Sequence, residues 1–226
     1  MNRIVTRMAG FAALVSAFGL ISLPAYAGDT YQGYTLYNQS CFLCHGTDGK
    51  GNGPLAKKLD VAPDDLTNGD NGAAEKSDRE LFGMIQGTIK HGSGASAMPQ
   101  WGLAMPGNQI NSLVAYIRFL QRSKHPLLGD PIVGKRVYDN NCAACHGRTG
   151  KGDGPLAAVL NLQPKDHTDS AEMNKHPNSH MVEIVTNGTP GKSLMPGWKD
   201  MLTKAEIEGV VSYLRLLSSY LCEREW

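Results

Sequence analysis

The sequence predicts an all-α protein built from two tandem copies of one small helical domain. Three observations lead to this prediction. The second half of the chain repeats the first at constant offsets, the apolar residues of the longer segments recur with helical spacing, and no segment shows a sustained alternation of apolar and polar residues. A chain of 226 residues is long enough for two domains of roughly 100 residues each.

The first 27 residues have the composition of an export signal. Arg3 and Arg7 form a positively charged start, an apolar run continues to Leu23, and Ala25-Tyr26-Ala27 places small residues at a cleavage site. We therefore expect residues 1–27 to be removed as a signal peptide and the rest of the chain to be exported to the periplasm. An uncleaved N-terminal anchor is the alternative, although the run is short for a membrane span.

The repeat defines the domain organisation. Segments of the first half recur at offsets of 101 and then 97 positions: 41–46 on 142–147, 50–56 on 151–157, and 98–101 on 195–198. The predicted parts are a first domain over 28–124, a linker over 125–131 and a second domain over 132–226. Pro126 and Gly129 mark the linker, because both residues break a preceding helix.

Each copy is expected to contain three main helices. They span roughly 31–44, 77–87 and 107–122 in the first copy, and 132–145, 179–188 and 203–219 in the second. Ser77 with Glu80, and Thr203 with Glu206, have the spacing of capping boxes. The Gly- and Pro-rich segment that follows each first helix is expected to lack regular structure.

The composition excludes several classes of function. The 22 basic and 21 acidic residues leave a formal net charge of +1, which excludes a strongly basic nucleic-acid-binding protein and a protein held at membranes by a polybasic surface. The hydrophobic fraction of 41%, with 26 glycines and 12 prolines, is typical of a folded, loop-rich chain rather than a disordered one.

The motif Cys-x-x-Cys-His occurs twice, at matching positions of the repeat. Its residues are Cys41, Cys44 and His45 in the first copy, and Cys142, Cys145 and His146 in the second. On a helix these positions share one face, so both thiols can bond to the vinyl groups of one haem while the imidazole binds its iron. The motif is the attachment signature of c-type haem, and it predicts two covalently attached haem c groups.

Other uses of paired cysteines fit this sequence poorly. A redox-active dithiol usually lies in an alternating strand–helix pattern, which is absent here. A four-cysteine zinc site needs all thiolates in one place, whereas these pairs are 101 positions apart in separate repeats. A structural disulfide across a two-residue gap is rare and strained.

Each repeat also offers a sixth ligand for the haem iron. Met98 precedes Pro99 and Met195 precedes Pro196, in both cases after a Gly-rich loop and followed by a tryptophan. A methionine on a loop stiffened by proline can present its thioether to the open face of the iron. Packing of these methionines in the core is the alternative.

Several other residues compete for these roles. Met105 and Met201 are near enough to be rival ligands, and His91 is the chief competitor in the first copy, although we expect it at the surface. The remaining histidines lack ligand spacing and are expected to be solvated: His125, His167, His176 and His180. Cys222 is left over and is expected to be buried or an inert free thiol, with an intermolecular disulfide as the alternative.

Each half resembles a class I c-type cytochrome domain, and the chain is similar in layout to the di-haem cytochrome c4 family. The resemblance implies that the carbonyls of Pro54 and Pro155 accept the Nδ1–H of the histidine that binds the iron. It also implies that the first helix packs across the last one through paired residues: Gly33 and Tyr37 near Tyr116, and Gly134 and Tyr138 near Tyr213.

One departure from cytochrome c4 concerns the segments after the haem motifs. Pro63-Asp64-Asp65-Leu66-Thr67 and Pro164-Lys165-Asp166-His167-Thr168 look more like cytochrome domains attached to respiratory or dehydrogenase systems. The resemblance to cytochrome c4 therefore concerns architecture, and its partners are not carried over.

The predicted function is electron transfer without catalysis. With His and Met bound, neither iron has a position for substrate, so no catalytic residue, small-molecule substrate or nucleic acid is expected. The expected partners are redox donors and acceptors, such as membrane-bound respiratory complexes or periplasmic dehydrogenases. The alternative is a di-haem enzyme of the peroxidase or thiosulfate dehydrogenase type, in which His91 could replace Met98. An electron-transfer subunit of an oxidoreductase complex is also compatible.

Overall fold

The computed structural model describes residues 29–59, 62–67, 73–89, 98–191 and 194–219. Within these residues every regular element is a helix, which confirms the predicted all-α class. The expected signal peptide, His91 and Cys222 lie outside the described residues. Among the helices that the structure describes, none combines the length and apolar character that crossing a membrane requires.

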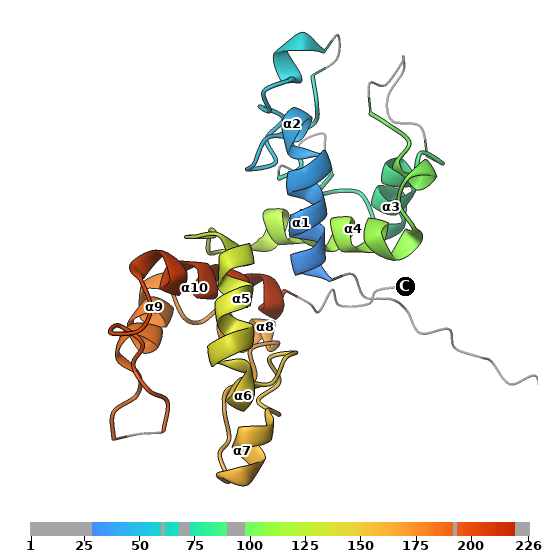
Figure 1. The fold of residues 1–226 in the computed structure, drawn as a ribbon. Coiled ribbons are helices and arrows are strands. Elements are labelled where there is room, and N and C mark those ends of the chain that lie inside the picture. The colour runs from blue at the N-terminus through green and yellow to red at the C-terminus, as the bar shows by residue number, and fades with distance from the viewer. Residues whose placement is uncertain (1–28, 60–61, 68–72, 90–97, 192–193, 220–226) are drawn as a thin grey trace, which may run out of the picture.

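Four helices correspond in order between the two domains, and the short elements between them differ (Figure 1). The elements of the first domain are α1 (Thr30–Ser40), α2 (Phe42–His45), the 3-10 turn η1 (Ala56–Lys58), α3 (Asp78–Gln86), the 3-10 turn η2 (Trp101–Leu103) and α4 (Gly107–Arg122). Those of the second are α5 (Pro131–Asn141), α6 (Ala143–His146), α7 (Pro155–Val159), α8 (Ser170–Met173), α9 (Asn178–Asn187) and α10 (Lys204–Ser218).

The expectation of irregular structure after the haem motif was wrong for the second domain, where α7 and α8 are short helices. Pro155 is the first residue of α7, a position at which the missing N–H costs no hydrogen bond. Asp169 caps α8 by accepting a hydrogen bond from the Glu172 N–H. Residues at their N-terminal ends therefore stabilise both helices, which are too short to show a periodic pattern in the sequence.

The first and last helices of each domain touch at a glycine. A Cβ atom added at Gly33 would lie 1.9 Å from the Ser112 carbonyl oxygen, so α1 and α4 are in direct backbone contact. A Cβ atom at Gly134 would lie 1.9 Å from the Gly209 carbonyl oxygen, where α5 crosses α10. Any larger residue would force each helix pair apart.

Tyrosine rings fill the space beside each glycine contact, as the resemblance implies. The ring centroids are 5.2 Å apart in both pairs, Tyr37 with Tyr116 and Tyr138 with Tyr213. The hydroxyl of Tyr37 donates to the Gly46 carbonyl at 2.6 Å, and that of Tyr138 donates to the Gly147 carbonyl at 2.9 Å. Each ring therefore ties the helix crossing to the end of the Cys-x-x-Cys-His segment.

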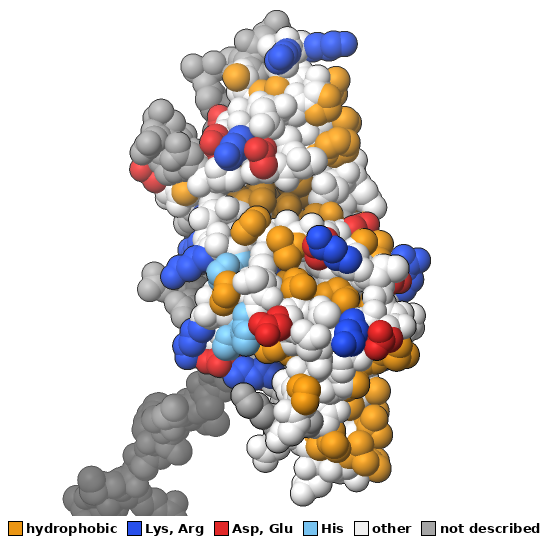
Figure 2. Space-filling view, turned by 90° about the vertical axis from the view of Figure 1, so that its left-hand side faces the viewer, with side chains coloured by type: hydrophobic (Ala, Val, Ile, Leu, Met, Phe, Trp, Pro, Cys, Tyr) orange, Lys and Arg blue, Asp and Glu red, His pale blue; other side chains and the backbone are white. Residues whose placement is uncertain are grey.

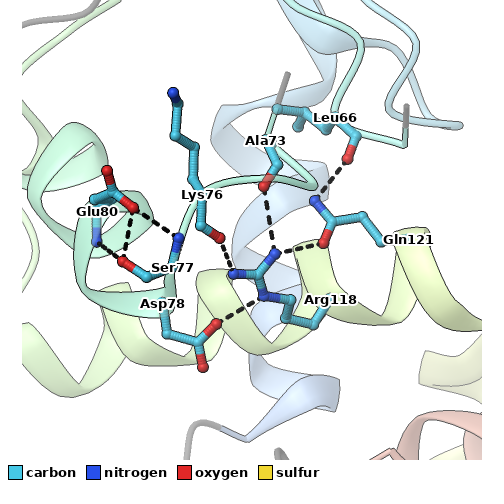
Figure 3. Close-up of polar contacts among 8 residues, drawn as sticks. All are labelled: Leu66, Ala73, Lys76, Ser77, Asp78, Glu80, Arg118 and Gln121. Atoms are coloured by element: carbon cyan, nitrogen blue, oxygen red, sulfur yellow. Dashed lines mark hydrogen bonds and ion pairs between the residues drawn. The ribbon is translucent and has the colours of Figure 1, made fainter. Parts of the chain in front are cut away.

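A buried arginine of α4 holds the segment before α3 (Figure 3). Arg118 is 6% exposed, and its guanidinium donates to the carbonyls of Ala73 and Lys76. Its Nε also lies 2.7 Å from a carboxylate oxygen of Asp78, at the start of α3. The fork of donors thus binds two carbonyls and a carboxylate at once, and the Ala73 carbonyl also accepts from the Lys76 N–H.

The second domain has the same clamp with one partner changed. Arg215 of α10 is 2% exposed and donates to the carbonyls of Met173 and His176. Its Nε donates to the side-chain amide oxygen of Asn178 at 2.8 Å, where the first domain has a carboxylate. Burial lowers the pKa of Arg215 to about 10, which still leaves the guanidinium charged at neutral pH.

Both predicted capping boxes are confirmed. The Ser77 hydroxyl accepts from the Glu80 N–H while the Glu80 carboxylate accepts from the Ser77 N–H, at the start of α3. Thr203 and Glu206 make the same pair of bonds at the start of α10. In each case the hydrogen bonds to the carboxylate lower the pKa of the glutamate.

The domains meet through α1 and α10, so that α2 and α6 lie toward opposite ends of the molecule (Figure 1). Leu216 of α10 is fully buried in the core cluster of the first domain. The Tyr31 ring of α1 meets the Tyr213 ring edge-on with centroids 5.4 Å apart. The Lys135 ammonium lies 5.9 Å from the centroid of each ring, a cation–π contact across the junction.

The segment between the domains lies along the second domain. The N–H groups of Leu128 and Gly129 donate to the Ser212 hydroxyl of α10 at 2.8 and 2.9 Å. The Asn178 side chain donates to the Pro126 carbonyl at 2.8 Å. Pro131, the last residue of the predicted linker, is the first residue of α5.

Candidate cofactor-binding sites

Each Cys-x-x-Cys-His segment forms a helical turn of its own, so the helices expected over 31–44 and 132–145 are each divided at the first cysteine of the motif. The Cys41 carbonyl accepts from the N–H groups of Cys44 at 3.1 Å and His45 at 2.9 Å. The second domain has the same bonds at the same lengths, from Cys145 and His146 to Cys142. Two thiols and an imidazole therefore leave the same side of one turn in each domain.

The four cysteines of these segments are free thiols. Burial raises the pKa of Cys41 and of Cys142 to about 12, whereas redox-active dithiols need a lowered thiol pKa. The positions of α2 and α6 at opposite ends of the molecule separate the two pairs, so they cannot share one zinc ion. Uncharged thiols at this spacing fit thioether attachment of haem.

A Gly-rich loop covers each motif closely. The Gly51 N–H donates to the His45 carbonyl at 2.9 Å, and φ at this residue is +71°. A Cβ atom there would lie 2.2 Å from the Pro63 carbonyl oxygen, so only glycine fits between the motif and the next loop. Gly152 has the same role beside His146, with φ of +77°.

A carbonyl oxygen faces Nδ1 of each motif histidine. The distance from Nδ1 to oxygen is 3.2 Å from His45 to Asp64 and 3.3 Å from His146 to Lys165. A proton on Nδ1 would donate to this carbonyl and leave Nε2 with a free lone pair for a metal. Burial also lowers the pKa of His146, which favours the neutral, ligating form.

The source of these carbonyls differs from the one that the resemblance implies. Pro54 and Pro155 were expected to supply them, but the oxygen atoms belong to the following loop. The turn that contains Pro54 bonds to α2 instead, because the Leu55 N–H donates to the Leu43 carbonyl at 2.8 Å. The expected kind of partner is present, and its position in the sequence is different.

The candidate methionines lie on loops that return to the middle helix of each domain. Met98 is half-buried and packs against the first core cluster together with Trp101. Met195 is also half-buried, and the Trp198 N–H beyond it donates to the Val185 carbonyl of α9 at 3.0 Å. The rival Met201 is 71% exposed, whereas Met105 packs against the first core cluster.

One histidine that we expected to be solvated lies beside the second motif. The ring of His167 stacks on the ring of His146, with centroids 4.3 Å apart and planes inclined by 17°. Its Nδ1 is buried and has no hydrogen-bond partner among the described residues. Burial, and then the nearby His146, lower the pKa of His167 to about 3, so its ring is neutral at physiological pH.

The repeat contained a signal for this residue. Leu66 stands 101 positions before His167, between matched neighbours on both sides: Pro63 and Pro164, Asp65 and Asp166, Thr67 and Thr168. A histidine opposite a leucine, with matched residues directly before and after it, marks a position where the two domains differ in chemistry.

Comparison with known protein families finds a matching family for each of the two domains. Residues 28–117 match the family described as "Cytochrome C oxidase, cbb3-type, subunit III", and residues 133–218 match "Cytochrome c". The cbb3-type cytochrome c oxidase subunit CcoP of Azospirillum sp. (strain B510) is 31% identical over 190 residues, which are 82% of this chain and 61% of that protein. The chain thus spans less than two thirds of that relative.

Two further similarities concern a smaller relative and a solved structure. Cytochrome c6 of Bryopsis maxima is 32% identical over 88 residues, which are 38% of this chain and 90% of that protein. A chain of the Kuenenia stuttgartiensis reducing HAO-like protein complex Kustc0457/Kustc0458 is 24% identical with a TM-score of 0.34, covering 83% of this chain and 96% of its own. The family matches and the two motif-bearing domains lead to one conclusion: the chain belongs to the c-type cytochromes and is a di-haem member with two covalently attached haem c groups.

Proposed function

We propose that the protein carries single electrons between redox partners through two His/Met-ligated haems. In this proposal Cys41 and Cys44 attach the first haem, with His45 and Met98 as its iron ligands. Cys142, Cys145, His146 and Met195 have the same roles in the second domain. The observation that carries the proposal is the repetition of one site: a turn of free thiols, an imidazole with Nδ1 at a carbonyl, and a half-buried methionine.

The residues of the chain have defined tasks in this function. When bound, haem c supplies a reversible one-electron couple at its iron. The carbonyls of Asp64 and Lys165 orient the imidazoles and increase their basicity through Nδ1. Methionine as the second ligand raises the reduction potential and leaves no position for a substrate. Because both ligands stay bound, little rearrangement accompanies electron transfer.

The proposed partners are proteins of a respiratory chain. Relatives of the chain are subunits of cbb3-type cytochrome c oxidases, which supports a role beside or within a membrane-bound respiratory complex. On the face drawn in Figure 2, basic and acidic side chains are interspersed. A mixed surface of this kind suits brief encounters with several partners better than steering by one strong charge.

The proposed location is the periplasm, after cleavage behind Ala27. Mass spectrometry of the protein from fractionated cells tests this proposal. A periplasmic holoprotein that begins at Gly28 is the expected result. A membrane-bound protein that retains residues 1–27 would contradict the proposal and support the uncleaved anchor.

The deciding experiment for ligation is the near-infrared absorption of the fully oxidised holoprotein, calibrated per haem. Methionine bound to ferric haem gives a weak charge-transfer band in this region, and we expect the intensity of two such haems. Met98→Ala and Met195→Ala should each remove half of the band, and the exposed control Met201→Ala should leave it unchanged. Intensity for one haem or none in the wild type would overturn the ligand assignment and favour the enzyme alternative.

A further inference from the structure

The loop that follows the haem motif has the same backbone arrangement in both domains. The Leu66 N–H donates to the Gly49 carbonyl at 2.7 Å, and the His167 N–H donates to the Gly150 carbonyl at 2.6 Å. The neighbouring aspartates each accept from a threonine two residues later: Asp65 from Thr67 and Asp166 from Thr168. Within this shared frame, the first domain has an aliphatic side chain where the second has an imidazole.

The imidazole of His167 has an unusual position for a histidine. One of its faces stacks on His146, the motif residue that binds iron in the proposed function. The Tyr138 ring lies near it at a centroid distance of 6.2 Å. Its buried Nδ1 has no partner among the described residues, so no hydrogen bond of this atom accounts for the position of the ring. A leucine would fill the same place without leaving a polar atom unpaired.

A stacked neutral ring interacts differently with the two oxidation states of an iron-bound imidazole. Ferric iron withdraws more electron density from its ligand than ferrous iron does, so the ligand ring is more positive in the oxidised state. The face of a neutral aromatic ring attracts positive charge. Stacking therefore stabilises the oxidised form more than the reduced form, which lowers the reduction potential.

We propose that His167, by stacking on His146, lowers the reduction potential of the second haem relative to what a leucine at this position would give. The inference rests on the proposed function, because it concerns the iron ligand of the second domain. His167 is a positioning and tuning residue and binds no iron itself. The step that it affects adds one electron to the iron of the second domain and transfers no proton.

Reciprocal exchange of the two residues tests the proposal in the full-length holoprotein. Potentials are measured by a redox titration that follows the visible spectrum and is fitted with one Nernst wave for each haem. In His167→Leu we expect one wave to move to higher potential, with the equilibrium constant for reduction increased about three- to tenfold. In Leu66→His we expect the other wave to move to lower potential, because the shared backbone frame places the new ring where His167 lies in the second domain.

Two further variants separate stacking from other effects. His167→Phe keeps an aromatic face on His146 and should retain the wild-type potential, whereas a potential as high as in His167→Leu would overturn the proposal. His180→Leu removes a histidine of the same domain whose side chain is 45% exposed, and it should move neither wave. Haem content and the visible spectrum of the reduced protein should match the wild type in every variant.

The outcomes distinguish this inference from the proposed function. Two reversible waves in the wild type that both stay in place in fully loaded His167→Leu would refute the role of His167 alone. Absence of the methionine band or of reversible one-electron waves in the wild type would refute the proposed function. If His167→Leu does not retain haem, His167→Phe and Leu66→His decide, and an unchanged potential in Leu66→His with a correctly loaded first domain would refute the proposal.

Discussion

Arg118 and Arg215 occupy the same place in the two domains, yet they bind different side chains. Both are buried, and both donate to two backbone carbonyls of the segment that leads into the middle helix. The remaining contact is a carboxylate of Asp78 in the first domain and an amide of Asn178 in the second. The fold therefore requires the carbonyl contacts and accepts either side chain at the third position.

The comparison of the two domains distinguishes the contacts that both share from the positions at which their residues differ. Both copies share the glycine crossings, the tyrosine pairs and the motif turns, and at Gly33 and Gly134 a backbone oxygen leaves no room for a larger residue. Positions where a side chain, rather than the backbone, makes the contact can carry different residues in the two domains. Asp78 and Asn178 are one such pair of positions, and Leu66 and His167 are another. Differences in function between the domains are therefore expected at such exchangeable positions.

The largest expected effect comes from the glycine crossings. Gly33→Ala and Gly134→Ala should each destabilise their own domain by about 3–5 kcal/mol, because the new Cβ would lie on a backbone oxygen of a packed helix. Urea unfolding of each variant, followed by circular dichroism, measures the loss. A loss below about 1 kcal/mol at either site would mean that the helices can separate freely. Gly107→Ala is a suitable control, since φ at Gly107 is not positive and a Cβ atom there would come no nearer than 3.5 Å to another atom.

Removal of the clamp should have the next largest effect. Arg118→Leu and Arg215→Leu should each cost about 2–4 kcal/mol, because in either domain two carbonyls and a side-chain oxygen lose the guanidinium as a donor. Denaturant unfolding with a separate signal from each haem would measure both domains in one molecule. A large loss for Arg118 alone would show that the ion pair with Asp78, rather than the carbonyl contacts, stabilises the clamp.

Exchange of the third partner should matter less. Asp78→Asn gives the first clamp the chemistry of the second, and Asn178→Asp does the reverse. Because the Asp78 carboxylate is 42% exposed, we expect a change of at most about 1 kcal/mol in each, with opposite signs. The two differences should shrink at high salt, which screens the ion pair. Equal stability changes at low and high salt would contradict an electrostatic origin.

The smallest effect concerns an acid-sensitive cluster of the second domain, in which one glutamate bonds to two lysines. Hydrogen bonds from Lys165 and then Lys175 lower the pKa of Glu172 from 4.5 to about 2. The stability that the carboxylate contributes is therefore complete above about pH 4.5 and is lost as the pH falls toward 2. Glu172→Gln should flatten the dependence of second-domain stability on pH in this window. An unchanged slope between pH 5 and pH 3 in unfolding experiments would contradict the pairing.

The long helices and the motif turns could be predicted from the sequence, because their signals are local. The last helix of the first domain was expected at 107–122 and lies there. The short helices α7 and α8 were missed, since five and four residues are too few to show a period. The clamp of Arg118 and the stacking of His167 on His146 were missed because they join segments far apart in the chain.

The hydrogen bonds of the linker determine where the molecule can be divided. Ser212 binds the N–H groups of Leu128 and Gly129, and Asn178 binds the Pro126 carbonyl, so this stretch is fastened to the second domain. A gene cut at residue 131 would discard those partners and leave the Ser212 hydroxyl without them. A cut directly after Arg122, where α4 ends, would keep the linker with the helices that bind it. The second domain would then be produced together with the N-terminal segment that is hydrogen-bonded to it.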